Sequence, residues 1–348
     1  MISVVLFCCW CLQMVLVMSN IECPVVSSID DRRTNKTTLR LVQYNVEWLF
    51  IDYYANMNCP GNGCTWTTLA NAEKHMSYVT NVTQYLNPDI INFCEVEGCD
   101  ELNLVKDQLN TNTNTSLYQS YLKWGTDTST GQNVGMLTKI DPFVSLYRSD
   151  EKISYPISGT KCGATSATGT TGVSKHYITE FKLSSMNIAM IGAHLLAFPT
   201  DPARCVQREG QAQVLQNIVS SYISKKYEVI LIGDMNDYDG DVLDVNTNHP
   251  ISRVLNILKG DDGQKNGTYK LTNVAITIPQ VDRYSDWWNS DNNCNTNSQQ
   301  DFSMIDHILV TPNIKNRITN AFIYHGYQEY CGKWDSDHFP VVIDISTI

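Results

Sequence analysis

The chain has 348 residues, of which 43% are hydrophobic and 18% are charged, and its formal net charge is −11. This length allows one large domain or two ordinary ones, and the hydrophobic content allows a full core. The acidic balance excludes a general basic field for holding nucleic acid or an anionic membrane. Any phosphate group must therefore be held locally, by a metal ion or by a few basic side chains.

The N-terminal segment is almost wholly apolar from residue 2 to residue 18, and the first basic side chain is Arg32. This length and the small residue Ser19 predict a secretory signal over 1–19, although no basic side chain precedes the apolar run. A membrane anchor is the alternative, but the run is at the short limit for spanning a bilayer. Asn-x-Ser/Thr sequons fit a glycosylating route, at Asn35, Asn81, Asn114 and Asn266. We therefore expect a protein that is secreted or lies in the lumen of the secretory or endolysosomal route.

Three of the twelve cysteines lie in the presumed signal, which leaves nine. Two pairs, Cys59 with Cys64 and Cys94 with Cys99, have the spacing of small local loops, and in an oxidising compartment we expect disulfides there. A zinc site would need tighter Cys-x-x-Cys pairs with histidine companions, which the sequence lacks. Because nine is odd, at least one thiol is free or pairs between chains.

Strands are predicted where apolar and polar residues alternate, and helices where apolar residues recur every three or four positions. After a polar, irregular segment over 20–38, the pattern predicts a strand over 39–47, a helix over 69–86, a strand over 89–96, a helix over 100–109, strands over 118–124, 134–139, 176–183 and 187–194, and a helix over 204–224. Residues 159–174, rich in Gly, Ser and Thr, are interpreted as a loop. The strand, helix, strand order indicates a layered α/β domain.

In the second half, a continuous apolar run from Val229 to Ile232 leads into Gly233, Asp234 and Asn236. Such a run predicts a strand buried on both faces, and alternation would place Asp234 and Asn236 on the same side of the extended chain. A polar stretch over 282–301 and strands over 304–310, 321–326 and 339–345 follow. No repeat or domain boundary is visible, so we expect one domain over 39–348.

Predicted strand ends repeatedly finish on polar side chains, at Asn45, Glu95, His194, Asp234 with Asn236, and Asp306 with His307, and Ser336-Asp337-His338 precedes the last strand. One such cluster alone is better explained as a strand or turn cap. Six in one α/β chain instead indicate a catalytic site.

Phosphodiester hydrolysis is the chemistry that would use this whole set. Glu95 and Asp337 offer hard oxygen ligands for Mg²⁺, or for Mn²⁺ or Ca²⁺, and a bound cation neutralises phosphate charge. His338 is the candidate general base, with Asp306 to orient its ring. The remaining side chains would hold the phosphate or the water, or help the leaving oxygen depart: Asn45, Asp234, Asn236 and His194.

At these residues the chain resembles the endonuclease/exonuclease/phosphatase superfamily, which includes pancreatic-type deoxyribonuclease. The carrying stretches come in the family's order: Gln43-Tyr44-Asn45-Val46, Phe93-Cys94-Glu95-Val96, Gly192-Ala193-His194-Leu195, Gly233-Asp234-Met235-Asn236, Met304-Ile305-Asp306-His307-Ile308 and Ser336-Asp337-His338-Phe339-Pro340-Val341. The resemblance implies an α/β (α+β) fold, a four-layer α/β/β/α sandwich of two mainly antiparallel sheets, with the site at one edge. Two features depart from it. Cys94 stands where the family usually has Gln, and Glu97 competes with Glu95 as the metal ligand.

The substrate is less determined by the sequence. We place first a nuclease that acts on DNA or RNA, and second a sphingomyelinase-like phospholipid phosphodiesterase. Trp287 and Trp288 could enter a membrane or stack on an unpaired base. Four basic residues could line a phosphate track, although scattered basic residues are usually just solvated surface: Lys123, Lys139, Arg204 and Arg208. A third hypothesis is a catalytically inactive secreted binding protein on the same fold, which would be expected to lose His338 or Glu95. A monomer is expected.

Overall fold

The computed structural model describes residues 22–23, 25, 29–51, 66, 68–164, 166–184, 186–261, 269–288, 301–326 and 336–348. The predicted signal, the Cys59 and Cys64 pair and the Asn266 sequon lie outside these residues. Among the described helices, none combines the length and the apolar character needed to cross a bilayer.

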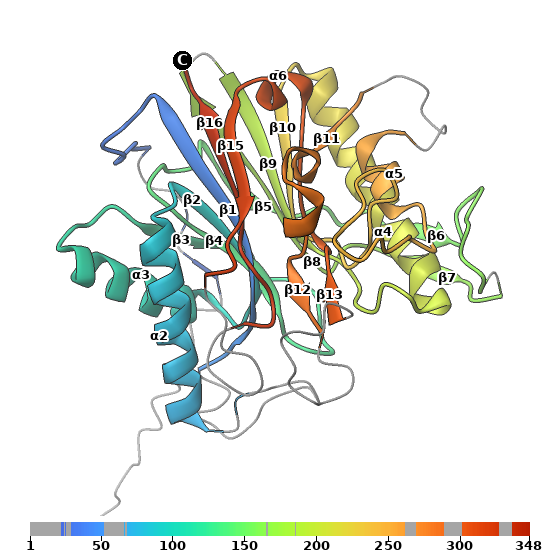
Figure 1. Ribbon diagram of the computed structural model, residues 1–348, viewed down its shortest axis with the longest axis horizontal. Helices are drawn as coiled ribbons and strands as arrows, with labels where there is room; N and C mark the ends of the chain where they lie inside the picture. Colours follow the sequence, from blue (N-terminus) through green and yellow to red (C-terminus); the bar gives the residue numbers. More distant parts are fainter. Residues whose placement is uncertain are drawn as a thin grey trace, which may run out of the picture.

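Two six-stranded sheets form the centre of the described structure (Figure 1). The first sheet has the order β15-β16-β1-β2-β4-β3, built from Ile318–Ile323, Val341–Ser346, Thr38–Leu49, Ile90–Val96, Asn133–Thr138 and Gln119–Leu122. The second has the order β11-β14-β10-β9-β8-β5, built from Thr272–Asn273, Asp306–Val310, Glu228–Asp234, Met186–His194, Lys175–Leu183 and Val144–Tyr147. Among the described strands of these sheets, only the pairs β1 with β2 and β9 with β10 run parallel, so the prediction of mainly antiparallel sheets is confirmed.

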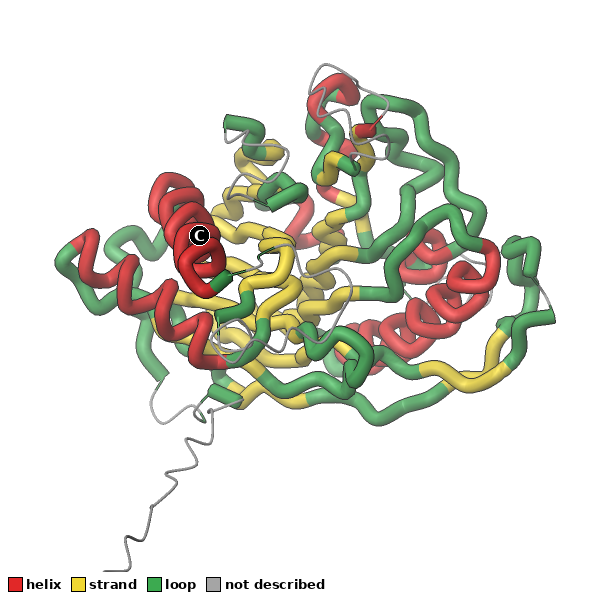
Figure 2. Tube along the Cα trace, turned by 90° about the horizontal axis from the view of Figure 1, so that it is seen from below, coloured by secondary structure: helices red, strands yellow, loops and turns green. Residues whose placement is uncertain are grey.

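The sheets pack face to face, and helices cover their outer faces (Figure 2). The inner apolar layer takes side chains from both sheets, including Leu41, Met190 and Ile232. Helices α2 (Leu69–Leu86) and α3 (Cys99–Thr113) cover the first sheet, while α4 (Pro202–Ser224) and α5 (Val254–Lys259) cover the second. The four-layer α/β/β/α sandwich is therefore confirmed, because each sheet buries one face against its partner and the other against helices.

Helix ends follow local chemistry that the sequence contains. Helix α2 has the predicted bounds because the Thr68 side chain accepts a hydrogen bond from the Asn71 amide, and Asn87 adopts a left-handed conformation at its end. Helix α4 begins two residues earlier than predicted, at Pro202, since the Asp201 carboxylate caps the amides of the next turn.

The short elements were not predicted. They are the hairpins β6 with β7 (Ile153–Tyr155, Gly169–Thr171) and β12 with β13 (Asp286–Trp287, Phe302–Ser303), strands β5 and β11, helices α5 and α6 (Pro312–Lys315), and the 3₁₀ turns Val274–Thr277 and Gln280–Asp282. Strands of two or three residues are too short to show a period. The predicted loop over 159–174 thus contains β7, and the polar stretch over 282–301 contains β12.

The disulfides differ from the predicted local loops. Cys99 pairs with Cys23, Cys162 pairs with Cys205, and Cys94 is a buried free thiol. The prediction of a Cys94–Cys99 loop is therefore wrong. Cys94 lies in β2 with its side chain in the layer between the sheets, whereas Cys99 begins α3 on the outer side, so the two sulfurs point to different layers.

Candidate active site

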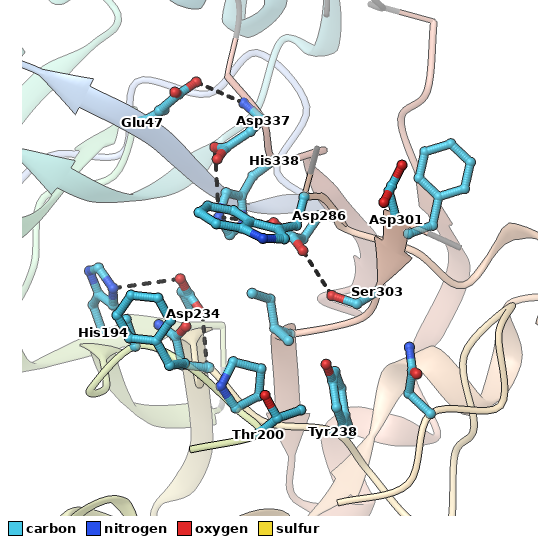
Figure 3. A pocket seen from close by; sticks show the side chains of 18 of the residues that line it. Glu47, His194, Thr200, Asp234, Tyr238, Asp286, Asp301, Ser303, Asp337 and His338 are labelled. Carbon is cyan, nitrogen blue, oxygen red and sulfur yellow. Dashed lines mark hydrogen bonds and ion pairs between the residues drawn. The ribbon is translucent and has the colours of Figure 1, made fainter. Parts of the chain in front are cut away.

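A pocket of about 520 Å³ opens at the end of the sandwich where β2, β9 and β10 finish. Its lining includes most of the predicted site residues, namely Glu95, His194, Asp234, Asn236, Asp337 and His338. Asn45 and Asp306 are buried directly behind it. Asp337 and His338 face Asp234 and His194 across the pocket (Figure 3). The fold thus brings together side chains that are far apart in the sequence.

Asp234 is placed by the pairing of β10 with its two neighbours. In register it stands beside His194 on β9 and beside Asp306 on β14. Gly233 permits this close packing, because it has φ of 155° and a Cβ there would lie 1.8 Å from the Ala193 carbonyl oxygen. Burial and the nearby Asp306 raise the pKa of Asp234 to about 8.

Asn236 reaches the pocket by a turn. The prediction that strand alternation would place it beside Asp234 is wrong. Strand β10 ends at Asp234, and Asn236 is in the left-handed region with φ of 49°. Its backbone amide donates to Asp234 Oδ1 at 2.8 Å, and its side-chain amide donates to the Leu195 carbonyl at 3.2 Å. This turn carries the chain away from the sheet while it keeps both side chains at the pocket.

Asn45 joins the ends of the two sheets. Its side-chain amide donates to Asp234 Oδ2 at 3.0 Å and to Glu95 Oε1 at 3.3 Å. Glu95 has φ of 67° at an irregularity between β1 and β2, and its Oε2 accepts from the Trp48 amide at 3.2 Å. The backbone irregularity therefore turns the Glu95 carboxylate toward the pocket.

Glu97, the competing carboxylate, has a different environment. It is buried outside the pocket lining, and its Oε2 accepts from the Ile51 amide at 2.9 Å. It thereby holds the chain that follows β1.

His338 and Asp306 form a tight buried pair. His338 Nδ1 lies 2.6 Å from Asp306 Oδ2, while Nε2 lies 3.7 Å from Asp286 Oδ1 and 3.9 Å from Asp337 Oδ1. Burial acts to lower the pKa of His338, but the surrounding carboxylates, Asp306 foremost, raise it well above its ordinary value. These carboxylates favour the protonated ring, which can hold a phosphate oxygen or give up a proton. His338 can act as the predicted general base only when another cation compensates these carboxylates.

His307, the neighbour of Asp306 in the sequence, points to the opposite face of β14. Its Nδ1 lies 3.0 Å from the Asn273 side-chain nitrogen, and its Nε2 lies 3.0 Å from the Asp237 carbonyl. It is fully buried and connects β14 to β11 and to the turn after β10. Its role is structural, and it does not line the pocket.

His194 is neutral. Its Nε2 lies 3.6 Å from Asp234 Oδ2 and 3.9 Å from Glu95 Oε1. Burial, together with the charges of Lys175 and His338, lowers its pKa well below the ordinary value. The Lys175 ammonium, 3.5 Å from His194 Nε2, is a cation that the sequence pattern did not single out. Only the register of β8 against β9, where Lys175 stands opposite His194, places it beside the site.

A family model described as the Endonuclease/Exonuclease/phosphatase family matches residues 42–338. The chain belongs to the endonuclease/exonuclease/phosphatase family. The predicted resemblance is therefore confirmed, and the protein is a metal-dependent hydrolase of the phosphodiesterase and nuclease type.

Solved structures with the same fold include an AP endonuclease from Archaeoglobus fulgidus, with a TM-score of 0.56 and 14% identity over 88% of this chain and 98% of that one. Another is a 3′ phosphatase, NExo from Neisseria, bound to a product DNA hairpin. It has a TM-score of 0.55 and 14% identity, over 88% of this chain and 99% of that one. At this identity the likeness shows the fold alone. No curated protein matches the sequence significantly.

The site of this family member has an acidic side suited to a divalent cation. Glu47, Glu95 and Asp337 line it, and the Asp337 amide donates to Glu47 Oε2 at 3.0 Å. Burial and the charge of Glu47 raise the pKa of Asp337 well above its ordinary value. No Lys or Arg is among the described residues that line the pocket, so a bound cation would be the counter-charge for these carboxylates. Among the described residues, Asp337 has its closest potential ligand partners in Asp286 and His338, with ligand atoms within 4.8 Å of one another, and Glu47 and Glu95 would have to move closer to share the ion.

Sequence reasoning missed three of the pocket's carboxylates, Glu47, Asp286 and Asp301. The sequence pattern places Glu47 at the end of a strand, two residues after Asn45, but assigns it no role. Asp286 lies on the two-residue strand β12, where it accepts from the Ser303 hydroxyl at 2.8 Å and faces His338. The position of Glu47 at the end of a strand with Asn45 was a usable signal, whereas nothing in the sequence around Asp286 set it apart.

Aromatic side chains stand at the pocket of this enzyme. Trp288 lines it and is 61% exposed, whereas Trp287 is buried, so only one of the predicted pair is available to a substrate. Phe198 also lines the pocket, is 51% exposed and has φ of 68°.

The pocket wall around Phe198 is held from behind by Arg208 of α4. The fully buried guanidinium donates to the carbonyl oxygens of residues 196–199 and to Asp237 Oδ2 at 3.0 Å. Arg208 is therefore a structural clamp that joins the chain after β9 to the turn after β10.

The four basic residues considered for a phosphate track do not form one. Arg208 is buried, Lys139 is held by Asn87 inside the first sheet, and Lys123 pairs with Glu22. Arg204 lies over the Phe198 ring, with its guanidinium carbon 4.4 Å from the ring centre. These four side chains are engaged by separate partners and form no continuous surface.

Proposed function

We propose that the protein is a secreted, Mg²⁺-dependent nuclease that cleaves phosphodiester bonds beside unpaired nucleotides of DNA or RNA. The observation that carries this proposal is the exposure of Phe198 and Trp288 on the walls of a pocket whose floor holds the catalytic side chains. A base stacked on an aromatic ring contributes about 1–3 kcal/mol, and only an unpaired base offers its face.

The protein's own residues divide the chemistry between the two sides of the pocket. Mg²⁺ held by Glu95 with Glu47 and Asp337 would supply charge to neutralise the phosphate. Asn236 and the neutral His194 offer hydrogen bonds to phosphate oxygens or to the leaving oxygen. His338, oriented by Asp306, would move the proton of the attacking water.

Secretion is part of the proposal and has independent support. The two described disulfides need an oxidising compartment to form and persist. The three described sequon asparagines, Asn35, Asn81 and Asn114, are all exposed, as glycan attachment requires.

The test offers the purified protein single-stranded DNA, RNA and blunt duplex DNA, each with Mg²⁺ and with a chelator. We expect cleavage of the single strands, loss of activity with chelator, and a shallow salt dependence, because no Lys or Arg lines the described pocket. Trp288→Ala should raise KM about tenfold, since one stacking contact is lost. The matched control Phe143→Ala removes another exposed aromatic side chain that does not line the pocket, and it should change nothing. Equal cleavage of duplex and single strands would contradict the proposal.

A second candidate is a phosphodiesterase for zwitterionic phospholipids. It is favoured by the acidic pocket wall, where Asp286 and Asp301 stand near Trp288, a combination that suits a quaternary ammonium headgroup. Sphingomyelin vesicles in the same assay distinguish the candidates. Phosphocholine release without cleavage of either nucleic acid would favour the lipid enzyme.

A further inference from the structure

A chain of hydrogen bonds crosses the layer between the two sheets and ends on Asp306. The Tyr177 hydroxyl donates to Asn92 Oδ1 at 2.8 Å, and Asn92 Nδ2 donates to Gln43 Oε1 at 2.6 Å. Gln43 Nε2 then donates to Asp306 Oδ1 at 2.9 Å, while Asp306 Oδ2 faces His338 Nδ1. All side chains of this hydrogen-bonded chain before His338 are completely buried: Tyr177, Asn92, Gln43 and Asp306. The polar chain therefore runs through a layer that is otherwise apolar.

The direction of the chain is set by the charge at its end. A carboxylate accepts hydrogen bonds only, so Gln43 must present its Nε2 to Asp306, and its Oε1 is left to accept from Asn92. Asn92 must then present its oxygen to Tyr177. Each donor thus points toward Asp306, and such aligned bonds strengthen one another in a low-dielectric interior.

A glycine on the facing strand leaves space for this hydrogen-bonded chain. Gly192 on β9 lies against it, and a Cβ there would lie 2.4 Å from Asn92 Oδ1 and 2.4 Å from the Tyr177 ring. The register of β1 against β2 places Gln43 beside Asn92, on the faces that point into the sandwich. Apolar side chains would fill this layer at lower cost, because buried polar groups must all be satisfied. The polar set therefore calls for a reason other than stability.

We propose that Tyr177, Asn92 and Gln43 are positioning residues, which fix the plane of the Asp306 carboxylate and through it the imidazole of His338. With Oδ1 held by Gln43, the carboxylate cannot turn, and Oδ2 stays on the His338 Nδ1–H bond. His338 then keeps one tautomer and presents Nε2 to the pocket. The inference rests on the phosphodiesterase chemistry of the family and does not depend on which natural substrate the enzyme takes.

The kinetic test uses bis(p-nitrophenyl) phosphate, a chromogenic phosphodiester, with saturating Mg²⁺. Gln43→Leu should lower kcat about tenfold to hundredfold and leave KM within about twofold, because the imidazole is misplaced but the phosphate contacts remain. Tyr177→Phe, which removes only the last donor, should lower kcat about twofold to fivefold. In the Asp306→Asn background, Gln43→Leu should add little.

Matched controls remove similar groups elsewhere. Gln216 is a buried glutamine of α4 that donates to the Ile257 carbonyl, and the Tyr121 hydroxyl donates to Asp141. Gln216→Leu and Tyr121→Phe should leave kcat within about twofold of the unaltered enzyme, as they do not reach Asp306. A kcat for Gln43→Leu equal to that of Gln216→Leu would overturn the proposal.

A spectroscopic readout separates positioning from mere stability. In protein labelled with ¹⁵N-histidine, the short bond from His338 to Asp306 should give a far-downfield Nδ1 proton signal, identified by its absence in His338→Ala. That signal should shift or broaden in Gln43→Leu and Tyr177→Phe and stay unchanged in the controls. An unmoved signal in both variants refutes the proposal, even if the unaltered protein does not hydrolyse the chromogenic diester. If Gln43→Leu does not fold, the Nδ1 proton signal of Tyr177→Phe alone tests the proposal.

Discussion

Replacement of Arg208 by methionine would break the clamp behind the pocket wall and leave Asp237 buried without its counter-charge. At 3.0 Å and an effective dielectric constant of about 20, the attraction between the two charges is about 5 kcal/mol. Part of this attraction is offset by desolvation of both groups. Removal of one partner from a buried pair costs about 3–5 kcal/mol, which is about a fifth or more of the stability of a typical domain. We expect Arg208→Met to lower the free energy of unfolding by that amount at pH 8.

The same prediction has a pH dependence with a definite sign. Burial raises the pKa of Asp237 from its ordinary value of 3.8 to about 6, even though Arg208 acts to lower it. A carboxyl group with a raised folded-state pKa is most favourable to folding below pH 4, and this contribution is lost as the pH rises through 6. Without Arg208 the folded-state pKa rises further. The difference in stability between Arg208→Met and the unaltered protein should therefore be largest at pH 8 and shrink toward pH 5, where Asp237 is protonated.

Urea unfolding followed by tryptophan fluorescence at both pH values measures this difference. Asp237→Asn in the Arg208→Met background should recover at least half of the loss, because the buried charge is then absent while the Ser252 hydroxyl keeps an acceptor. Arg204→Met on the same helix is the control, with an expected cost below about 1 kcal/mol. A loss for Arg208→Met below 1 kcal/mol, or one equal at both pH values, would refute the reasoning about the clamp.

Three further predictions concern the site and the compartment. Glu95→Gln should raise the Mg²⁺ concentration needed for activity and lower turnover by orders of magnitude. Glu97→Gln should instead cost about 1 kcal/mol of stability and leave the metal requirement unchanged. The reverse result would mean that Glu97 is the ligand. His338→Ala should lower kcat by about 10²- to 10⁴-fold, and the double variant with Asp306→Asn should be scarcely worse, so multiplicative losses would show that Asp306 has another function. The protein should be recovered from medium with glycan at one or more of the described sequons and with most cysteines blocked to alkylation; a reduced, unglycosylated product would contradict secretion.

The sequence predicted the layers because long elements have strong periods. Helix α2 and the strands that carry Asn45, His194 and Asp234 were found within a few residues of their bounds. Polar residues at the ends of those strands also indicated which edge of the sandwich holds the site. These signals are local, since each depends only on neighbouring residues in the chain.

Other parts of the site depend on pairing between distant segments, which one sequence does not show. Lys175 reaches His194 through strand register, and Asp286 reaches His338 through an isolated bridge between two short segments. The spacing of Cys94 and Cys99 resembled a loop, but spacing does not tell which layer a side chain enters. For the same reason Gln43 gave no sign that it contacts Asp306 on the opposite sheet.

The pairing of β1 with β16 has a consequence for how the enzyme is made. Strand β16 completes the first sheet beside β1, and the Ser336 hydroxyl, just before it, donates to the Asn45 carbonyl across 291 residues. A ribosome synthesises Asn45 early and His338 near the end of the domain, so a growing chain holds only one side of the pocket. Until β16 arrives, β1 has an open edge that invites pairing with other chains. A chain that stops before His338 thus lacks the proposed general base and leaves the β1 edge unpaired, so we expect it to be inactive and to aggregate more readily than the complete domain.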